Sequence, residues 1–593
     1  MLRKRLSLKT IHYISLFLLM ILASCSGKAK GDLGACGGNV IRYPMIADAK
    51  SLDPINTDDR YSNLTAGLIY EGLVQYHFLK RPLEIIPNLA ESMPEISKDE
   101  LTYTFKLRKG IMFQDSKHFP NGKGREVKAK DFVYSFMRLA DPKISTQGYW
   151  VFDGKILGID EWRKKQESAP KTDFDNPPAG FAALDDYTVQ IKLSQKYPQL
   201  LYVLAMTYTY VVPREVVEAL GKDFTNNPVG TGPYIFDSWM RNAKISLKRN
   251  PTYHDDFYPS EGEAGDKEKG LLEDAGKKLP FADCVEMQVF VEPQPSWLNY
   301  VKGNVDFLAV PKDNYSAAVD ENKKLKEEFS KRDIRLDIYP YQDVTYIAFN
   351  NTDPVIKKGG ANLRKAIATA INEEEQIKLF RNGRAIVAQS PIPPGLAGYD
   401  PDYRNPYKQH SVEKAKELLK QSGFPTGVDL NYETTNSSDS RQMAESVQRY
   451  LKPLGINLKI NMNQFSELLQ KIDKGKAQMW GIAWGADYPD AENFLQLLYG
   501  PNKAPGPNGS NFNNPEYNEM FSKMRVMRDS PERREIIKQM VKVFESEMPW
   551  IPNDHRIGFV LIHPWLQNVK FNDIGGNYSK YFKVDLARKA KGN

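Results

Sequence analysis

Residues 428–484 read VDLNYETTNSSDSRQMAESVQRYLKPLGINLKINMNQFSELLQKIDKGKAQMWGIAW. Apolar residues alternate with polar ones at Val428, Leu430 and Tyr432, and this period of two predicts a strand. The next apolar residues recur every four positions and predict one face of a helix: Met443, Val447 and Leu451. A second strand, a second helix and a third strand ending near Trp484 follow by the same criteria. Alternating strands and helices require crossover connections, so the stretch predicts an α/β fold with a parallel sheet covered by helices.

Further elements are expected along the 593 residues, a length that suggests more than one domain. Ser411 is expected to cap a helix that ends at Gly423. A second helix is expected to begin at Ser530 and Pro531 and to end before Pro549. Alternation predicts four more strands: 103–107, 187–193, 285–291 and 334–338. Charged or turn-forming composition predicts two surface segments or loops: 254–278 and 501–514.

The N-terminus has the form of an export signal. Basic residues precede an apolar run from Ile11 to Leu22, and the sequence LASC then ends at Cys25. The run is about half the roughly 20 residues that a spanning helix needs, so cleavage is expected. The ending resembles the lipobox of bacterial lipoproteins, which implies a signal peptide at 1–24, a lipid on Cys25 and a flexible tether at 25–38. An ordinary signal peptide with an incidental cysteine is the alternative.

Composition and charge limit the classes of partner that are expected for this protein. The formal net charge is +7, and it falls to +3 without the four basic residues of the signal, Arg3, Lys4, Arg5 and Lys9. No concentrated basic face is evident, so nucleic acid is not expected as a partner. The hydrophobic content of 41% and charged content of 26% are typical of a globular protein. We therefore expect an exported body in the cell envelope that a lipid anchor holds to a membrane.

Motifs for catalysis, metals and phosphate are missing from the sequence. The seven histidines are dispersed, and no His-Glu-x-x-His or Cys-x-x-Cys pattern occurs. The glycine pair Gly230 and Gly232 lacks the remaining residues of a phosphate-binding loop. Cys36 and Cys284 could form a disulfide in an exported protein or remain separate thiols. The sequence thus predicts neither an enzyme, nor a metal site, nor a cofactor.

A set of short motifs runs in order over about residues 40–570. The longest part comprises LTYTFKLRKG at 101–110, Phe113 and VKAKDFVYSF at 127–136. The others are SLDP at 51–54, YEGLV at 70–74, VGTGPY at 229–234, NPTY at 250–253, LRKAI at 363–367, PIPPG at 391–395 and WGADYPD at 484–490. This set closely resembles the family-five extracellular solute-binding proteins, which are the oligopeptide-, dipeptide- and nickel-binding subunits of ABC importers.

The resemblance implies a two-lobe periplasmic-binding-protein fold of the α/β class, with a hinge between the lobes and an extra α/β domain inserted in the first lobe. The implied bounds are 39–55, 185–337 and 549–593 for lobe I, 56–184 for the inserted domain and 338–548 for lobe II. The parallel-sheet pattern at 428–484 falls inside lobe II. The segment 254–278 is longer than in the family.

The resemblance also implies a mechanism. Family members close like a hinged trap on a ligand, and a peptide ligand lies as an extended strand that pairs with protein main chain. Backbone pairing is common to all peptides, and water-filled pockets accept varied side chains. The chain is thus expected to bind short peptides, to act as a monomer and to deliver its ligand to the membrane subunits of an ABC permease.

The motif WGADYPD carries the implied ligand-binding residues: Trp484, Gly485, Ala486, Asp487 and Tyr488. In oligopeptide-binding relatives, an aspartate three residues after this tryptophan neutralises the ammonium of the peptide, and Asp487 occupies that position. A buried ammonium needs such a carboxylate partner. Alternatively, Asp487 caps a helix that begins near Pro489. Trp484 and Tyr488 either line the cleft or pack in the core.

One position departs from the family pattern. Some relatives have an arginine three residues before the tryptophan, where it can meet the carboxylate of the ligand, but this chain has Gly481. Either another cation, for instance Lys471 or Lys474, binds the carboxylate, or the carboxylate stays in water. Asp490 and Asn493 are similar to polar positions of the motif. Each could cap a helix or contact the ligand.

Two other functions remain alternatives, because one fold can carry many functions. The first is a receptor of the same fold for a non-peptide ligand such as a metal chelate, a sugar or haem. The second is an exported hydrolase or adhesin that has borrowed the fold. Identification of a co-purified ligand distinguishes the hypothesis of a peptide ligand from that of a non-peptide ligand.

Overall fold

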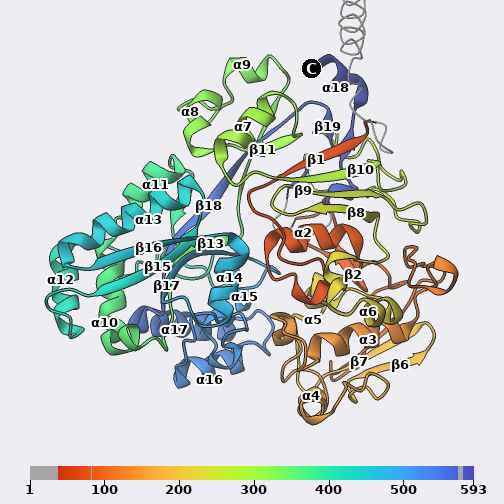
Figure 1. The fold of residues 1–593 in the computed structure, drawn as a ribbon, viewed down its shortest axis with the longest axis horizontal. Coiled ribbons are helices and arrows are strands. Elements are labelled where there is room, and N and C mark those ends of the chain that lie inside the picture. The colour runs from red at the N-terminus through yellow and green to blue at the C-terminus, as the bar shows by residue number, and fades with distance from the viewer. Residues whose placement is uncertain (1–37, 82, 572–573, 575–577, 593) are drawn as a thin grey trace, which may run out of the picture.

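The computed structural model describes residues 38–81, 83–571, 574 and 578–592. The predicted signal peptide, the lipid site Cys25 and Cys36 lie outside these residues. Cys284 is disulfide-bonded, but its pairing with Cys36 stays a prediction. The described chain forms two lobes that meet at the centre of the molecule (Figure 1). Among its helices, none combines the length and the apolar character needed to cross a bilayer.

The left-hand lobe of Figure 1 is built on the sheet that contains residues 428–484. The predicted order of elements is confirmed: β15 (Asp429–Thr435), α13 (Ser438–Leu451), β16 (Asn457–Asn463), α14 (Phe465–Asp473) and β17 (Met479–Gly485). β15 is parallel to β16 along its length and parallel to β17 at Tyr432 and Glu433. The predicted parallel pairing is therefore confirmed for these strands.

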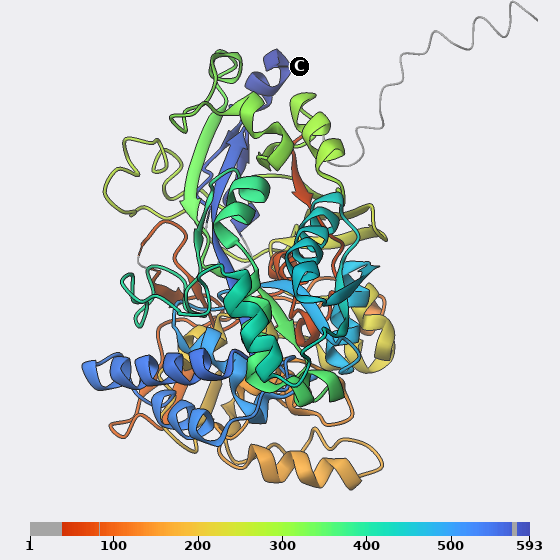
Figure 2. The same cartoon turned by 90° about the vertical axis from the view of Figure 1, so that its left-hand side faces the viewer.

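Antiparallel strands extend this sheet toward the other lobe. β13 (Asp343–Phe349) pairs with β17 on one side and with β18 (Trp550–Ile562) on the other. β18 is 13 residues long and continues past β13 to pair with β12 (Arg335–Pro340) and β11 (Phe307–Ala309). Figure 2 shows the green and blue strands of this region side by side. Since β12 leads directly into β13, two neighbouring segments connect the lobes, which is the arrangement of a hinge.

Both helices predicted from their end signals are confirmed. The side chain of Ser411 accepts a hydrogen bond from the Lys414 amide at the start of α12 (Val412–Gln421). Ser530 accepts one from the Arg533 amide at the start of α17 (Pro531–Glu547). Each cap satisfies an amide that has no partner within the helix. The apolar face of α17 is buried: Ile536, Ile537, Met540, Val541 and Phe544.

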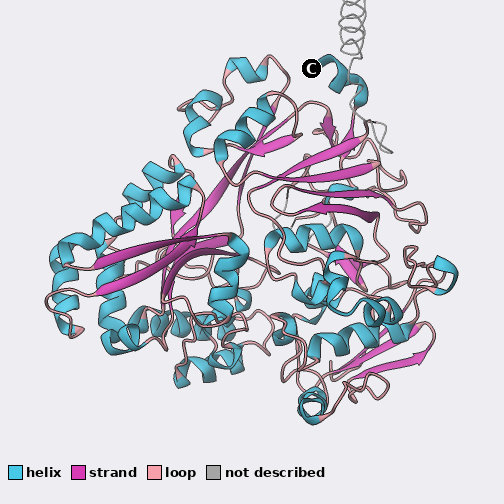
Figure 3. Cartoon of the chain, in the orientation of Figure 1, coloured by secondary structure: helices cyan, strands magenta, loops and turns pink. Residues whose placement is uncertain are grey.

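The right-hand lobe contains two separate four-stranded sheets (Figure 3). One consists of β1 (Val40–Met45), β10 (Cys284–Val289), β9 (Lys244–Arg249) and β8 (Tyr234–Met240). The other consists of β4 (Glu95–Ile96), β5 (Thr102–Lys106), β7 (Thr188–Lys192) and β6 (Phe181–Asp185), with α3 (Ala129–Ala140) packed against β6 and β7. The four additional strand predictions are confirmed as β5, β7, β10 and β12.

The two segments expected at the surface are more deeply integrated than predicted. Residues 254–278 contain no helix or strand, but Asp266 is fully buried beside Lys570, at 2.8 Å. Residues 501–514 are a loop apart from the end of a short 3-10 helix (Gly500–Asn502), yet Asn508 is fully buried and donates to the carbonyls of Tyr499 and Phe512. Composition correctly indicated irregular backbone, whereas burial depends on contacts with distant parts of the chain.

Candidate ligand-binding site

A cavity of about 510 Å³ lies between the lobes. This volume falls within the range of roughly 300–1,000 Å³ that is usual for small-ligand sites. Both lobes, including strands β13 and β18, contribute polar side chains to its wall: Asp58, Asp59, Tyr76, Asp343, Arg381, Ser437, Asp473, Asp487, Asn553 and Arg556. The wall of the cavity is thus shared between the two lobes.

β17 exposes part of its backbone edge to this cavity. One edge pairs with β13 along the whole strand, while the other pairs with β15 only at Met479 and Trp480. Within the described chain, residues 481–485 have no strand partner on that second edge, and all of them line the cavity. The site of Gly485 is open, since an added Cβ would meet nothing within 4 Å. An extended ligand can therefore add a strand here.

Gly481 has a steric reason for lacking a side chain. A Cβ at this position would lie 2.2 Å from the Tyr432 hydroxyl, far inside van der Waals contact. The arginine that some relatives carry here could not be accommodated without displacing Tyr432. The departure from the family pattern is thus coupled to a neighbouring strand, which the linear sequence does not reveal.

Asp487 lies just beyond β17 with one carboxylate oxygen fixed. Its Oδ2 accepts a hydrogen bond of 2.8 Å from Asn493 Nδ2. No ion pair to Asp487 occurs among the residues that the structure describes, and the remaining exposed part of the side chain borders the cavity. Burial raises the pKa of Asp487 to about 7. A desolvated carboxylate without a cation is suited to bind a ligand ammonium.

Asn493 holds both Asp487 and Trp484 in place. This fully buried residue belongs to α15 (Glu492–Leu495). Its Oδ1 accepts from the Asp487 amide and from Trp484 Nε1, both at 3.0 Å. Asp487 itself caps no helix, because Asp490 accepts from the Glu492 amide at the start of α15. Trp484 and Ala486 also line the cavity.

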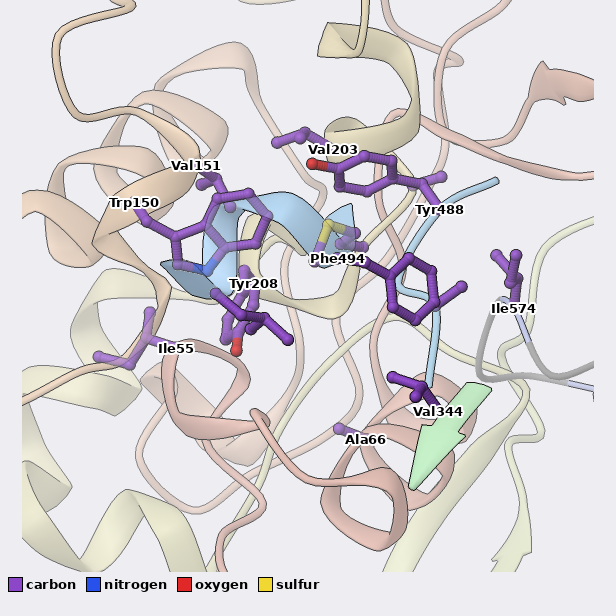
Figure 4. Close-up of a cluster of buried hydrophobic side chains, with 14 of the residues drawn as sticks. Ile55, Ala66, Trp150, Val151, Val203, Tyr208, Val344, Tyr488, Phe494 and Ile574 are labelled. Carbon is purple, nitrogen blue, oxygen red and sulfur yellow. The ribbon is translucent and has the colours of Figure 1, made fainter. Parts of the chain in front are cut away.

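Tyr488, which the sequence also implied as a ligand contact, is packed in the core. Its side chain is fully buried and hydrogen-bonds to Glu492. The ring stacks on Tyr202 of the other lobe, with centroids 6.1 Å apart. Figure 4 shows Tyr488 within a buried cluster that includes Trp150 and Phe494. Tyr488 is absent from the cavity wall and instead joins the lobes beside it.

Additional carboxylates line the same cavity as Asp487. Lys50 Nζ lies 3.0 Å from Asp58 and 3.5 Å from Asp473 of the opposite lobe. Burial raises the pKa of Asp473 to about 6, and the pKa of Asp59 also rises to about 6. Together with Asp487, these groups leave an excess of acid over base in this region. The excess favours a cationic group on the ligand.

The lysines suggested from the sequence as carboxylate partners do not line the cavity. Lys471 instead bonds to Glu433, at 3.1 Å. Arg556, which does line the cavity, donates through Nε to Asp343 at 2.7 Å. In the described part of the chain, no group of three or more His, Cys, Asp or Glu residues is placed to hold a metal ion.

Comparisons with known proteins place these features in one family. The family model for bacterial extracellular solute-binding proteins, family 5 middle, matches residues 84–506. The chain is 26% identical over 571 residues to "Di/tripeptide-binding protein 2" of Pseudomonas aeruginosa, covering 92% of this chain and 93% of the relative. It is 25% identical over 540 residues to "Heme-binding protein A" of Haemophilus influenzae, covering 88% of each.

A solved structure agrees with these matches. The chain is similar, with a TM-score of 0.76 and 26% identity, to an ABC transporter-associated periplasmic binding protein from Helicobacter pylori in complex with the peptide STSA. This likeness covers 92% of the present chain and 98% of the other. Since the family model spans more than half of the chain, the protein belongs to family 5 of the bacterial extracellular solute-binding proteins.

Proposed function

We propose that the protein binds short peptides in the cavity between its lobes and delivers them to the membrane subunits of an ABC transporter. The observation that carries this proposal is Asp487. This carboxylate has no ion-pair partner in the described chain, and it lies at the end of an unpaired strand edge inside the cavity. A peptide offers both complements, a main chain that pairs with a strand and a free ammonium.

The peptide lies along the open edge of β17. Residues 481–485, which have no strand partner on this edge, provide a length of about 16 Å at about 3.3 Å per residue. Main-chain hydrogen bonds supply affinity that does not depend on the side chains of the ligand. Trp484, Gly485 and Ala486 form the wall beside this edge. Water between ligand side chains and the cavity wall accommodates different peptides.

Peptide binding favours the closed arrangement of the lobes. In this proposal the hinge lies in β12–β13 and β18, lobe I comprises 39–55, 185–337 and 549–593, lobe II comprises 338–548, and 56–184 is an inserted domain. The contact of Lys50 with Asp473 supports closure, because it joins the lobes across the cavity. The ligand shifts the equilibrium by binding more tightly to the closed form.

We further propose that the protein works at the cell envelope as a monomer. Residues 1–24 direct export, Cys25 carries the lipid, and 25–38 form the tether. The extracellular family supports export. Mass spectrometry of the mature N-terminus tests the anchor: a diacylated or triacylated Cys25 is expected, and an unmodified N-terminus beyond Cys25 refutes it.

The peptide assignment is tested against a non-peptide ligand, since one relative is named for haem. Native mass spectrometry of freshly purified protein identifies what occupies the cavity, and we expect peptide masses. Calorimetry then compares oligoalanines with free and N-acetylated ends. We expect tight binding of the free form alone. A haem, sugar or metal chelate as the retained ligand, with no peptide binding, excludes the proposal.

A further inference from the structure

Glu292 is a carboxylate of the right-hand lobe that bonds to a helix of the left-hand lobe. It follows shortly after β10, and the Phe290 amide just before it donates to the Met45 carbonyl of β1 at 2.7 Å. Its Oε2 accepts a hydrogen bond from Ser438 Oγ at 2.6 Å, and its two oxygens lie 3.2 and 3.3 Å from the Ser438 amide nitrogen. Ser438 begins α13. This contact therefore joins the sheet of one lobe to a helix of the other.

The amide of Ser438 needs an acceptor from outside its own helix. The first amides of an α-helix have no carbonyl one turn earlier to accept their hydrogen bonds. The N-cap residue Ser437 serves a different amide, because its Oγ accepts from the Ser440 amide at 3.2 Å. Glu292 supplies the missing acceptor from the other lobe. A carboxylate is well suited to this place, since the start of a helix carries a partial positive charge.

The contact of Glu292 with Ser438 lies at the edge of the cavity and outside its wall. Val291 and Ser437, which precede the two partners in the chain, both line the cavity, whereas Glu292 and Ser438 do not. The pair is thus placed to respond to the separation of the lobes and not to the side chains of a ligand.

A second residue bonds to the same helix from the segment after β11. Lys312 Nζ donates to Gln442 Oε1 at 2.6 Å and lies 3.7 Å from Asp439 in the first turn of α13. The Lys312 carbonyl also accepts from Asn382 Nδ2 at 2.7 Å. The start of α13 therefore receives a carboxylate and an ammonium, which complement its free amide and its acidic side chain.

We propose that Glu292 is a positioning residue that holds the lobes closed and so raises the affinity for every ligand without touching any of them. This inference rests on the proposed peptide-binding function. Separation of the lobes returns the Glu292 carboxylate and the Ser438 amide to water, so their bond stabilises the closed form alone. A contact that favours the closed form lowers the apparent Kd of each ligand of that form by the same factor.

The test uses the full protein and calorimetry with free peptides of three, four and five alanines. In Glu292→Ala we expect the Kd to rise about 3- to 10-fold, by one factor for all three peptides. The factor is that of an ordinary hydrogen bond, because both partners are partly exposed to water. Glu292→Gln keeps an acceptor oxygen and should lose less affinity.

Ser438→Pro removes the other side of the contact and should match Glu292→Ala. Proline is well tolerated at the first position of a helix, where it removes the amide hydrogen, and this change also removes the hydroxyl. The residue before a proline must be extended, and Ser437 already is, with φ −75° and ψ 154°. The double variant with Glu292→Ala completes a mutant cycle, in which we expect no loss beyond that of either single variant.

Glu321→Ala is the matched control, because Glu321 is exposed and lies outside the cavity wall, and it should bind all three peptides with native affinity. Circular dichroism verifies that each variant is folded. Native affinities in Glu292→Ala overturn the inference, and so does a loss that differs between peptide lengths. Losses that multiply in the double variant overturn it as well. Absence of binding of every peptide by the native protein instead refutes the proposed function itself.

Discussion

Replacing Asp487 with asparagine is expected to weaken peptide binding while stabilising the empty protein. The carboxylate must be ionised to bind an ammonium, but burial in the empty cavity raises its pKa to about 7 and so disfavours the ionised form. Asparagine keeps the shape and an oxygen that can accept the hydrogen bond from Asn493. The variant therefore removes the charge with little change in packing.

The pKa shift determines the size of the stability effect. The pKa of Asp487 rises from 3.8 to about 7, and each unit corresponds to about 1.4 kcal/mol. The ionised group thus costs at most about 4 kcal/mol, and partial exposure to cavity water lowers the expected value to about 1–4 kcal/mol. Because the folded state holds the proton more tightly than the unfolded state, this group contributes stability below pH 4 that is lost as the pH rises to 7.

The effect on binding has the opposite sign. Loss of one desolvated charge pair costs about 2–5 kcal/mol, which is a rise in Kd of about 30-fold to several thousand-fold. This loss applies to peptides with a free ammonium and not to N-acetylated peptides. In the native protein, affinity is expected to decrease below pH 7, where the ligand must displace a proton from Asp487.

Urea denaturation of the ligand-free proteins at pH 4.5, 6 and 8 measures the stability change, and calorimetry at pH 8 measures binding. Asp402→Asn serves as the control, since Asp402 is exposed and is not among the residues that line the cavity. The reasoning is refuted if Asp487→Asn is no more stable than the native protein at pH 8 and binds free and acetylated peptides with native affinities.

Three further predictions test individual contacts. Gly481→Ala is expected to lower the free energy of unfolding by about 1–3 kcal/mol through the clash with Tyr432, and Tyr432→Phe should relieve part of this loss in thermal denaturation. Asn493→Ala removes the bonds that position the anchor carboxylate, so we expect a Kd about tenfold higher by calorimetry and a loss of about 1–3 kcal/mol in urea. For His254, burial alone would lower the pKa, but the adjacent Glu71 carboxylate outweighs it and raises the pKa. Stability should therefore fall as the pH rises through that pKa, and His254→Gln should abolish the fall between pH 5.5 and 8.

Local sequence patterns were sufficient to predict the strands of the sheet and the helices beside it. The alternation at Val428, Leu430 and Tyr432 predicted β15, because period two is a property of the strand itself. Ser411 and Ser530 marked helix starts, since capping involves only the next few residues. The motif around Asp487 indicated, through family resemblance, residues that line the cavity.

The orientation of individual side chains could not be read from these patterns. Trp484 borders the cavity, whereas Tyr488 is buried against Tyr202 of the other lobe. The sequence offers no basis for distinguishing the roles of these two aromatic residues. Their surroundings differ only because of the segments that pack beside them in the folded chain.

The sequence by itself thus determined the order of strands and helices, the two-lobe family fold and the motif around Asp487 that borders the cavity. Only the tertiary structure decided that Asn553 lines the cavity, where it is the extra residue of a bulge in β18 opposite β13. It also decided that Tyr432 excludes a side chain at Gly481. Periodicity reports the conformation of neighbouring residues, whereas these placements arise from packing between segments that are distant in the chain.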